Sequence, residues 1–200
     1  MCIRDRQYAE VNDLARFVPK DAPHQGLVLE VAALEDVWLT DALALANDDN
    51  RPLLILDQVT DPHNVGAIFR TAAAFDAVAV VTQDRHAPPE SGALAKAASG
   101  GLEITPWVRV VNLARALEEI AEAGYWRIGL SGHAGVTLDQ ALTPGRNALV
   151  LGAEGDGMRR NIEEHCDQLA KLPISAQMES LNVSNAAAIA LYAATVRRGA

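Results

Sequence analysis

The chain has 200 residues, of which 50% are hydrophobic and 22% charged, with 14 Gly and 9 Pro. This length suits one ordinary domain or two very small ones, and the composition excludes a collagen, a low-complexity linker and a disordered tail. The longest apolar runs are about a dozen residues, shorter than the roughly 20 of a membrane-spanning helix, so we expect no membrane span. The first residues carry charges where a secretory signal is apolar, and we therefore expect a cytoplasmic protein.

The net charge of −9 is unusual for a nucleic-acid-binding protein, because phosphate contacts come from Lys and Arg. Most of this charge lies in residues 1–50, which hold 10 acidic and 4 basic residues, against 16 and 13 in residues 51–200. The charge therefore neither favours nor excludes RNA. Cys2 and Cys166 are too few for a disulfide framework or a cysteine zinc site, so we interpret both as thiols and expect no metal.

Residues 1–50 differ in pattern from the rest of the chain. The sequence predicts a strand over 25–31 and a short helix over 35–46, and the polar break at 47–50 marks a domain boundary. Strand-like and helix-like runs then alternate. The predicted strands are 53–57, 77–82, 107–111, 126–131, 148–152 and 168–173, and the predicted helices are 65–75, 92–99, 113–123, 159–165 and 184–197.

The predicted strands are apolar throughout rather than alternating, which is typical of a parallel sheet covered on both faces. We therefore expect an α/β fold with an open, mostly parallel sheet and helices on both faces. Ligands of such sheets bind beyond the carboxyl ends of the strands. The loops that follow the strands are accordingly the places to look for chemistry, and three of them stand out.

The first loop, residues 57–66, opens a helix whose one charged side chain is Arg70. A helix that is apolar nearly all round is a buried one, so we expect a buried guanidinium that needs anionic or carbonyl partners. Helical side chains lean toward the N-terminus, which lets Arg70 reach back toward Asn64. Two interpretations stay open. Asn64 caps the helix and Arg70 forms a structural ion pair, or both residues are functional.

The second loop, residues 151–160, is rich in glycine and carries Glu154 at its centre. Gly152 and Gly157 have the spacing of a P-loop, but Met158 and Arg159 stand where that motif needs Lys and Ser or Thr, and the glycine order is not the dinucleotide fingerprint. Neither nucleotide site is predicted. The glycines indicate a turn whose backbone approaches something closely. Glu154 is then either a solvated turn residue or a partner for Arg70.

The third loop, residues 172–185, precedes the almost wholly apolar last helix. Ser180, Asn182 and Ser184 are all good helix-capping types, and we expect at least one of them to cap. The N-terminus of that helix also offers free N–H groups to an anion. One apolar face of the helix is predicted to be core or subunit interface. It consists of Ala187, Ile189, Ala190, Leu191 and Ala194.

Together the three loops resemble the three motifs of the SpoU family of RNA ribose 2′-O-methyltransferases. The matching segments are Asp57-x-x-x-Asp61-Pro62-x-Asn64-x-Gly66-x-x-x-Arg70, then Leu149 to Met158, then Leu172-Pro173-Ile174 with Ser180-Leu181-Asn182-Val183-Ser184. They occur in order over residues 53–198. Within the family, the sequence is most similar to the enzymes that methylate a guanosine ribose of 23S rRNA, and next to those that act on a guanosine of tRNA.

The resemblance implies a fold and an assembly that general rules of chain topology do not suggest. It implies a C-terminal deep trefoil knot and a homodimer with the active site at the subunit interface. It also implies a small RNA-binding domain ahead of the catalytic one. On this basis residues 1–50 are interpreted as a remnant of that domain and its linker in an N-terminally truncated chain, and residues 51–200 as the methyltransferase domain.

The resemblance further implies S-adenosylmethionine as cofactor, in contact with Gly152, Leu172 and Leu181. It assigns the base for the ribose hydroxyl to Arg70, which is oriented by Asn64 and Glu154, while two further residues line the site. These are Ser180 and Asn182.

Two roles for Arg70 stay open. A guanidinium with a pKa above about 12 is a poor base at pH 7. Arg70 is therefore either deprotonated transiently or holds an RNA phosphate and stabilises the developing alkoxide as a cation. A catalytically silent RNA-binding or assembly protein of the same fold is the alternative function.

Overall fold

The computed structural model describes residues 6–19, 22, 24–46 and 49–198. The chain divides into two compact units, Met1–Leu34 and Glu35–Ala200. In the smaller unit, α1 spans Val11–Leu14. The strand predicted over 25–31 is wrong: Gln25 and Gly26 form a turn with left-handed backbone, and the apolar side chains that follow are mostly exposed because no strand pairs with this described segment.

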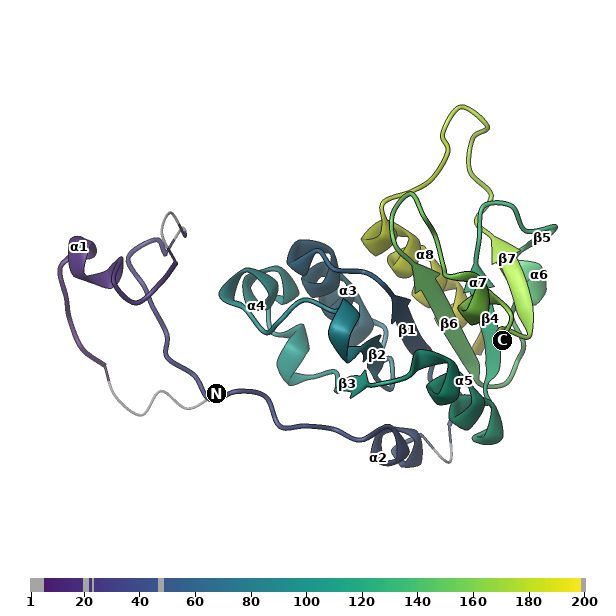
Figure 1. Cartoon of the computed structure of the whole chain (residues 1–200), viewed down its shortest axis with the longest axis horizontal. Helices are drawn as coiled ribbons and strands as arrows, with labels where there is room; N and C mark the ends of the chain where they lie inside the picture. The colour runs from purple at the N-terminus through teal and green to yellow at the C-terminus, as the bar shows by residue number, and fades with distance from the viewer. Residues whose placement is uncertain (1–5, 20–21, 23, 47–48, 199–200) are drawn as a thin grey trace. The chain divides into compact units, whose positions relative to one another are not determined.

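The larger unit is built on a seven-stranded sheet in the order β3-β2-β1-β6-β4-β7-β5, and every pair is parallel (Figure 1). This confirms the predicted fold class. The strands are β1 (Leu53–Asp57), β2 (Val80–Gln83), β3 (Trp107–Val110), β4 (Trp126–Leu130), β5 (Val136–Thr137), β6 (Asn147–Gly152) and β7 (Gln168–Lys171). The short strand β5 was not predicted, since two residues show no period.

Helices cover both faces of this sheet (Figure 1). They are α2 (Leu39–Ala44), α3 (Pro62–Ala74), α4 (Gly92–Ala98), α5 (Leu113–Glu122), α6 (Leu138–Ala141), α7 (Arg160–Glu163) and α8 (Val183–Arg198), with short 3-10 turns η1 (Asp84–His86) and η2 (Gly101–Glu103). On one face, Ile55 and Val150 share a core cluster with Leu117 of α5. Alternation along β1 and β6 turns their other side chains to the opposite face, where α8 contacts both β6 and α3.

The carboxyl ends of β1 and β6 lie side by side, with Asp57 paired to Gly152. From β1 the chain continues to β2 on one side, and from β6 it continues to β7 on the other. Such a reversal of strand order opens a crevice for ligands. The first two motif loops therefore begin at one crevice, as predicted. The trefoil knot stays a prediction of the resemblance.

Candidate active site

The first motif forms the beginning of α3. The carboxylate of Asp61 caps this helix by accepting hydrogen bonds from the backbone N–H groups of His63 (3.1 Å) and Asn64 (3.3 Å). The interpretation of Asn64 as the cap is therefore wrong, and its side chain is left for another contact. A Cβ at Gly66 would lie 2.6 Å from Cβ of Ala97. Helix α4 thus approaches α3 so closely that no side chain fits at this position.

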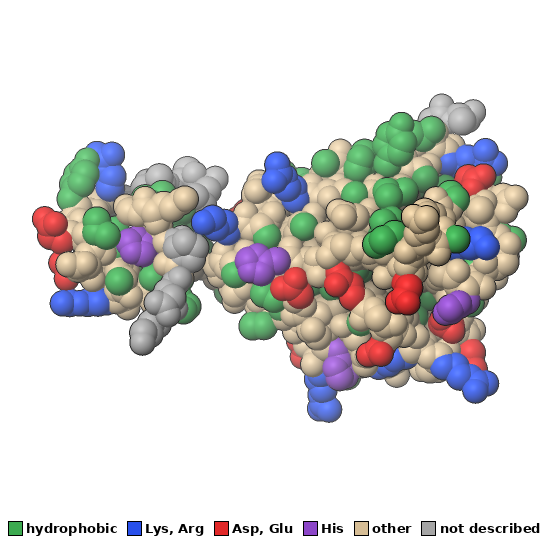
Figure 2. All heavy atoms as spheres, turned by 90° about the horizontal axis from the view of Figure 1, so that it is seen from above, with side chains coloured by type: hydrophobic (Ala, Val, Ile, Leu, Met, Phe, Trp, Pro, Cys, Tyr) green, Lys and Arg blue, Asp and Glu red, His purple; other side chains and the backbone are tan. Residues whose placement is uncertain are grey.

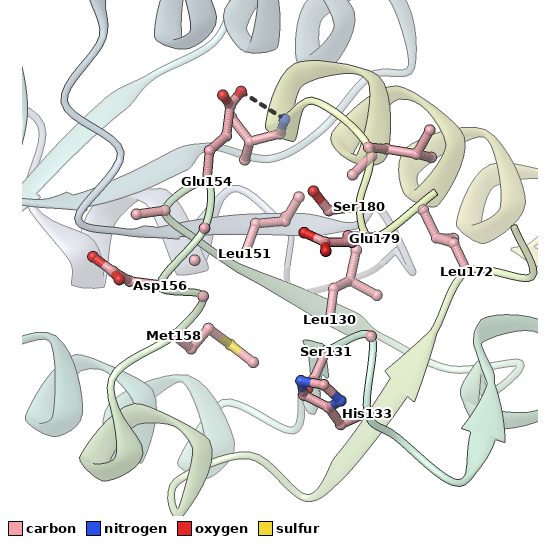
Figure 3. A pocket seen from close by; sticks show the side chains of 18 of the residues that line it. Leu130, Ser131, His133, Leu151, Glu154, Asp156, Met158, Leu172, Glu179 and Ser180 are labelled. Carbon is pink, nitrogen blue, oxygen red and sulfur yellow. Dashed lines mark hydrogen bonds between the residues drawn. The ribbon is translucent and has the colours of Figure 1, made fainter. Parts of the chain in front are cut away.

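Side chains from all three motif loops meet at Glu154. Its Oε1 accepts hydrogen bonds from Nδ2 of Asn64 (3.1 Å) and Nδ2 of Asn182 (2.6 Å). It also accepts the backbone N–H of Val183 at the start of α8 (3.2 Å), which Figure 3 shows as a dashed line. The same Nδ2 of Asn182 donates to Oδ1 of Asn64 (2.9 Å). The structure thus brings three of the predicted site residues together.

Asn182 has a second role at the start of α8. Its Oδ1 accepts hydrogen bonds from the backbone N–H of Ser184 (2.9 Å) and from Oγ of the same residue (2.5 Å). This confirms that one of the three capping types caps the helix. The capping contact fixes the amide group of Asn182, so that its Nδ2 faces Glu154.

The second motif is a tight hairpin. Ala153 and Gly157 exchange two backbone hydrogen bonds, and Gly155 and Gly157 have φ of 85° and 71°. A Cβ at Gly152 would collide with the carbonyl group of Gly157 and the backbone nitrogen of Met158. The backbone that approaches Gly152 closely is therefore the returning arm of its own loop.

A cavity of about 310 Å³ lies beside this hairpin (Figure 3). Its walls include the three predicted cofactor-binding residues, which are Gly152, Leu172 and Leu181, together with Glu154 and Ser180. Apolar surface comes from Leu130 of β4 and Leu151 of β6, and the turn 131–133 contributes further lining. The structure thus places the predicted cofactor residues around one space.

The position of the Arg70 side chain differs from the prediction. It lies on the exposed side of α3, and within the described part of the chain this side chain forms no hydrogen bond or ion pair. The expected burial and the suggested pairing with Glu154 are both wrong. The buried face of α3 consists of Val65, Gly66, Ile68, Phe69 and Ala72, while its remaining apolar residues include alanines, which tolerate exposure.

The sequence analysis did not predict an ion pair at the base of the hairpin, between Asp57 and Arg159, which we call the clamp. The fully buried carboxylate of Asp57 accepts hydrogen bonds from the backbone N–H (2.8 Å) and Nε (2.9 Å) of Arg159, and Nη2 of Arg159 donates to Oε1 of Gln83 (2.7 Å). This clamp joins the end of the hairpin to the ends of β1 and β2. The signal was an acid ending a wholly apolar strand, since a buried carboxylate needs a partner.

The described residues were also compared with the requirements of a reactive thiol, a metal site and a membrane-spanning helix. Burial raises the pKa of the Cys166 thiol to about 12, which leaves it protonated at neutral pH, and Cys2 lies outside the described residues. No group of three or more His, Cys, Asp or Glu side chains in the described part is placed to hold a metal ion. None of the described helices is both long and apolar enough to span a membrane.

Residues 51–192 match the model of the SpoU rRNA Methylase family. The chain belongs to this family. Over 192 residues it is 44% identical to the 23S rRNA (guanosine-2'-O-)-methyltransferase RlmB of Pseudomonas aeruginosa, covering 94% of this chain and 74% of the relative. It is 42% identical over 180 residues to the enzyme of the same name from Pseudomonas syringae pv. tomato, covering 88% and 72%.

Solved structures of SpoU methyltransferases share the fold. The methyltransferase AviRb from Streptomyces viridochromogenes, crystallised with AdoMet, has a TM-score of 0.68 at 25% identity, covering 76% of this chain and 59% of that one. The TrmH/SpoU tRNA modifying enzyme of A. aeolicus has a TM-score of 0.66 at 25% identity, covering 80% and 82%. This chain thus spans about three fifths of the AviRb chain. The SpoU resemblance deduced from the motifs is confirmed.

Proposed function

We propose that this SpoU-family protein transfers a methyl group from S-adenosylmethionine to the ribose 2′-hydroxyl of a guanosine in 23S rRNA, in the cytoplasm. One observation carries the proposal: loops from three distant parts of the sequence meet at Asn64, Glu154 and Asn182, beside a cavity at the carboxyl edge of a parallel sheet. Supporting it, relatives that are 42% and 44% identical are named as methyltransferases for this reaction.

The residues around the cavity fit S-adenosylmethionine. Its volume of about 310 Å³ lies at the small end of the range for ligand sites, and Leu130, Leu151 and Leu172 offer apolar surface for an adenosyl group. Gly152 and Leu181 complete the wall, together with residues of the turn 131–133 and of the hairpin. When bound, S-adenosylmethionine supplies an electrophilic methyl group on a positively charged sulfur.

The contacts around Glu154 support a role for this residue in positioning the ribose. Glu154 is held by three N–H donors on one oxygen, which leaves Oε2 available to a hydroxyl or amino group of the nucleotide. The Asn64 and Asn182 amides are locked to each other as well, so this part of the site is rigid before RNA arrives. Alignment of this kind supplies much of the rate of a transfer reaction.

The exposure of Arg70 favours the second of its two roles. Its guanidinium faces solvent, and no acidic side chain in the described part of the chain pairs with it, so it can bind an anion. It follows Asn64 by six residues on α3, about 9 Å along the helix axis, a distance that an extended arginine side chain can bridge toward an RNA phosphate. We therefore infer that Arg70 holds a phosphate oxygen and stabilises the alkoxide electrostatically.

We further propose a homodimer that forms through α8. Ile189, Tyr192 and Val196 lie along one side of this helix and are 46%, 60% and 54% exposed. The ring of Tyr192 packs edge-on against Phe75 at the end of α3, with centroids 6.0 Å apart. Figure 2 shows hydrophobic side chains gathered along one edge of the larger unit. An exposed apolar stripe of this size is typical of a subunit interface.

Methylation of defined transcripts tests the function. The chain is incubated with methyl-labelled S-adenosylmethionine and unmodified 23S rRNA or tRNA, and 2′-O-methyl positions are mapped. We expect one guanosine of 23S rRNA to be modified. Modification of tRNA alone would assign the chain to the tRNA enzymes. The absence of both modification and cofactor binding would indicate a catalytically silent RNA-binding protein.

A further inference from the structure

The lining of the cofactor cavity is acidic. Four of its residues carry carboxylates, whereas no Lys or Arg occurs among the described residues that line it. The four are Glu154, Asp156, Glu163 and Glu179. They come from the hairpin, from α7 and from the loop before α8, and Figure 3 places Glu179 within the ring of lining residues near Leu130 and Leu151.

These carboxylates are not neutralised by basic side chains. Within the described part of the chain, none of the four forms an ion pair with Lys or Arg. The donors to Glu154 are two side-chain amides and a backbone N–H, which carry no net charge. The nearest Arg of the hairpin, Arg159, is engaged with Asp57 instead. His133 is the other titratable side chain among the described lining residues, and the four carboxylates outnumber it, so the cavity presents a negative potential to whatever enters it.

We propose that this acidic lining selects the ligand by charge, so that the cavity binds the cationic methyl donor more tightly than the neutral product of the same reaction. The inference rests on the proposed function. In the transfer, the methyl carbon forms a bond to the ribose 2′-oxygen and its bond to sulfur breaks. The electron pair of that bond stays on sulfur, and the hydroxyl proton leaves to solvent. The ligand in the cavity thus loses one positive charge.

The loss of this charge weakens the attraction that the cavity exerts. In surroundings open to water, one unit charge about 4–8 Å from another changes affinity by a factor of about two to five. Salt screens the effect, because the carboxylates are largely exposed. Charge selection of this kind favours exchange of spent product for fresh donor after each turnover. Glu163 and Glu179 are specificity-determining residues in this scheme, separate from the hydrogen bonds around Glu154.

Calorimetric titration measures the selection directly. The Kd values of S-adenosylmethionine and of its demethylated product, S-adenosylhomocysteine, are determined for the wild-type chain, Glu179→Gln, Glu163→Gln and the double variant. We expect the ratio of product Kd to donor Kd to fall about two- to fivefold in each single variant, and further in the double variant. The loss should lie in donor affinity, with product affinity nearly unchanged.

The matched control is Glu122→Gln, because Glu122 is exposed at the end of α5, is not among the cavity's lining residues and should leave the ratio unchanged. Retained product affinity shows that a variant still has a folded cavity. As a test without mutation, the wild-type ratio should also fall between about 50 mM and about 500 mM salt. A ratio unchanged by the double variant and by salt would contradict charge selection and leave the proposed function intact. A wild-type chain that binds neither ligand would instead overturn the proposed function.

Discussion

Arg70 is exposed on α3, so it can be replaced without disturbing the core, and its variants can distinguish the role of base from the role of phosphate-binding cation. We expect Arg70→Ala to keep the wild-type stability and affinity for S-adenosylmethionine, because the residue neither packs in the core nor lines the cavity. Its single-turnover methylation rate should fall at least about 100-fold. Arg70→Lys should lose a similar factor at every pH, since Lys lacks the planar fork that fixes a phosphate.

Rapid-quench assays across a range of pH check this expectation. Recovery of the Arg70→Lys rate as pH rises would assign the base role to this residue instead, because a lysine that loses its proton becomes a base. Arg115→Ala serves as the control, since the Arg115 side chain is 77% exposed on α5 and, among the described residues, its one ion pair is with Glu119 one turn away. Near-normal methylation by Arg70→Ala would exclude both roles.

Gly152 lines the cavity, and its own loop also requires a glycine at this position. An added Cβ would collide with the backbone of Gly157 and Met158. We therefore expect Gly152→Ala to lower the free energy of unfolding by about 1–3 kcal/mol, as overpacking does. Thermal unfolding compares it with Gly132→Ala, whose Cβ has its nearest neighbour at 3.9 Å. Equal stability of the two variants would contradict this account.

At the scale of elements, Arg127 and Asp167 join the beginning of β4 to the residue before β7. Nε and Nη2 of Arg127 donate to the two carboxylate oxygens at 2.8 and 2.6 Å, and the side chains are 16% and 23% exposed. The hydrogen bond from Arg127 lowers the pKa of Asp167 below its ordinary value of 3.8. A lowered folded-state pKa contributes stability that is present above the ordinary value and is lost as pH falls through the folded value.

Asp167→Asn should therefore reduce the free energy of unfolding by about 1–2 kcal/mol at pH 7. The difference from wild type should shrink as pH falls below about 3.8, because the unfolded carboxyl is protonated first, and it should vanish once the folded carboxyl is protonated too. Denaturant titrations at several pH values measure it. Glu164→Gln removes a fully surface pair with Arg160 and should change stability by less than about 0.5 kcal/mol. A pH-independent loss in Asp167→Asn would show that the pair does not act through its charge.

Two apolar segments show when a local sequence pattern is enough to predict a strand and when it is not. The strand at 53–57 is predicted to the residue, because a run of four apolar residues that ends in Asp57 has few alternatives in a parallel sheet. The apolar run at 25–31 has a similar composition, but it forms no strand. Strand formation depends on a partner, which the local sequence does not specify.

The sequence predicted which residues belong to the candidate site better than it predicted which side chains contact one another. The resemblance to the SpoU motifs implied that Asn64, Glu154 and Asn182 share one site, and the structure brings their side chains into contact. The pairing of Asp57 with Arg159 joins residues far apart in sequence, and no local pattern encodes it. Arg70 was misplaced because alanines in α3 resemble a buried face while tolerating water.

For the whole molecule, the exposed stripe on α8 predicts the oligomeric state. Light scattering should give about twice the chain mass for the wild type. Tyr192→Glu should give a monomer that remains folded, because the ring is 60% exposed and outside the core. Glu103→Gln, an exposed change on η2, is a control for nonspecific effects on association. A monomeric wild-type protein with full activity would contradict a site that is built at the interface.

The strand order also has a consequence for how the protein is made on the ribosome. β4 lies between β6 and β7, and both of these partners follow it in the chain. During synthesis, the apolar residues of β4 are therefore translated before any strand that can pair with them. One edge of β1 likewise has no partner until β6 has been translated. Unpaired strand edges of this kind invite association between nascent chains. The free edge of β1 and one edge of β4 can therefore close only when β6 has emerged up to residue 152, and the other edge of β4 only when β7 has emerged up to residue 171.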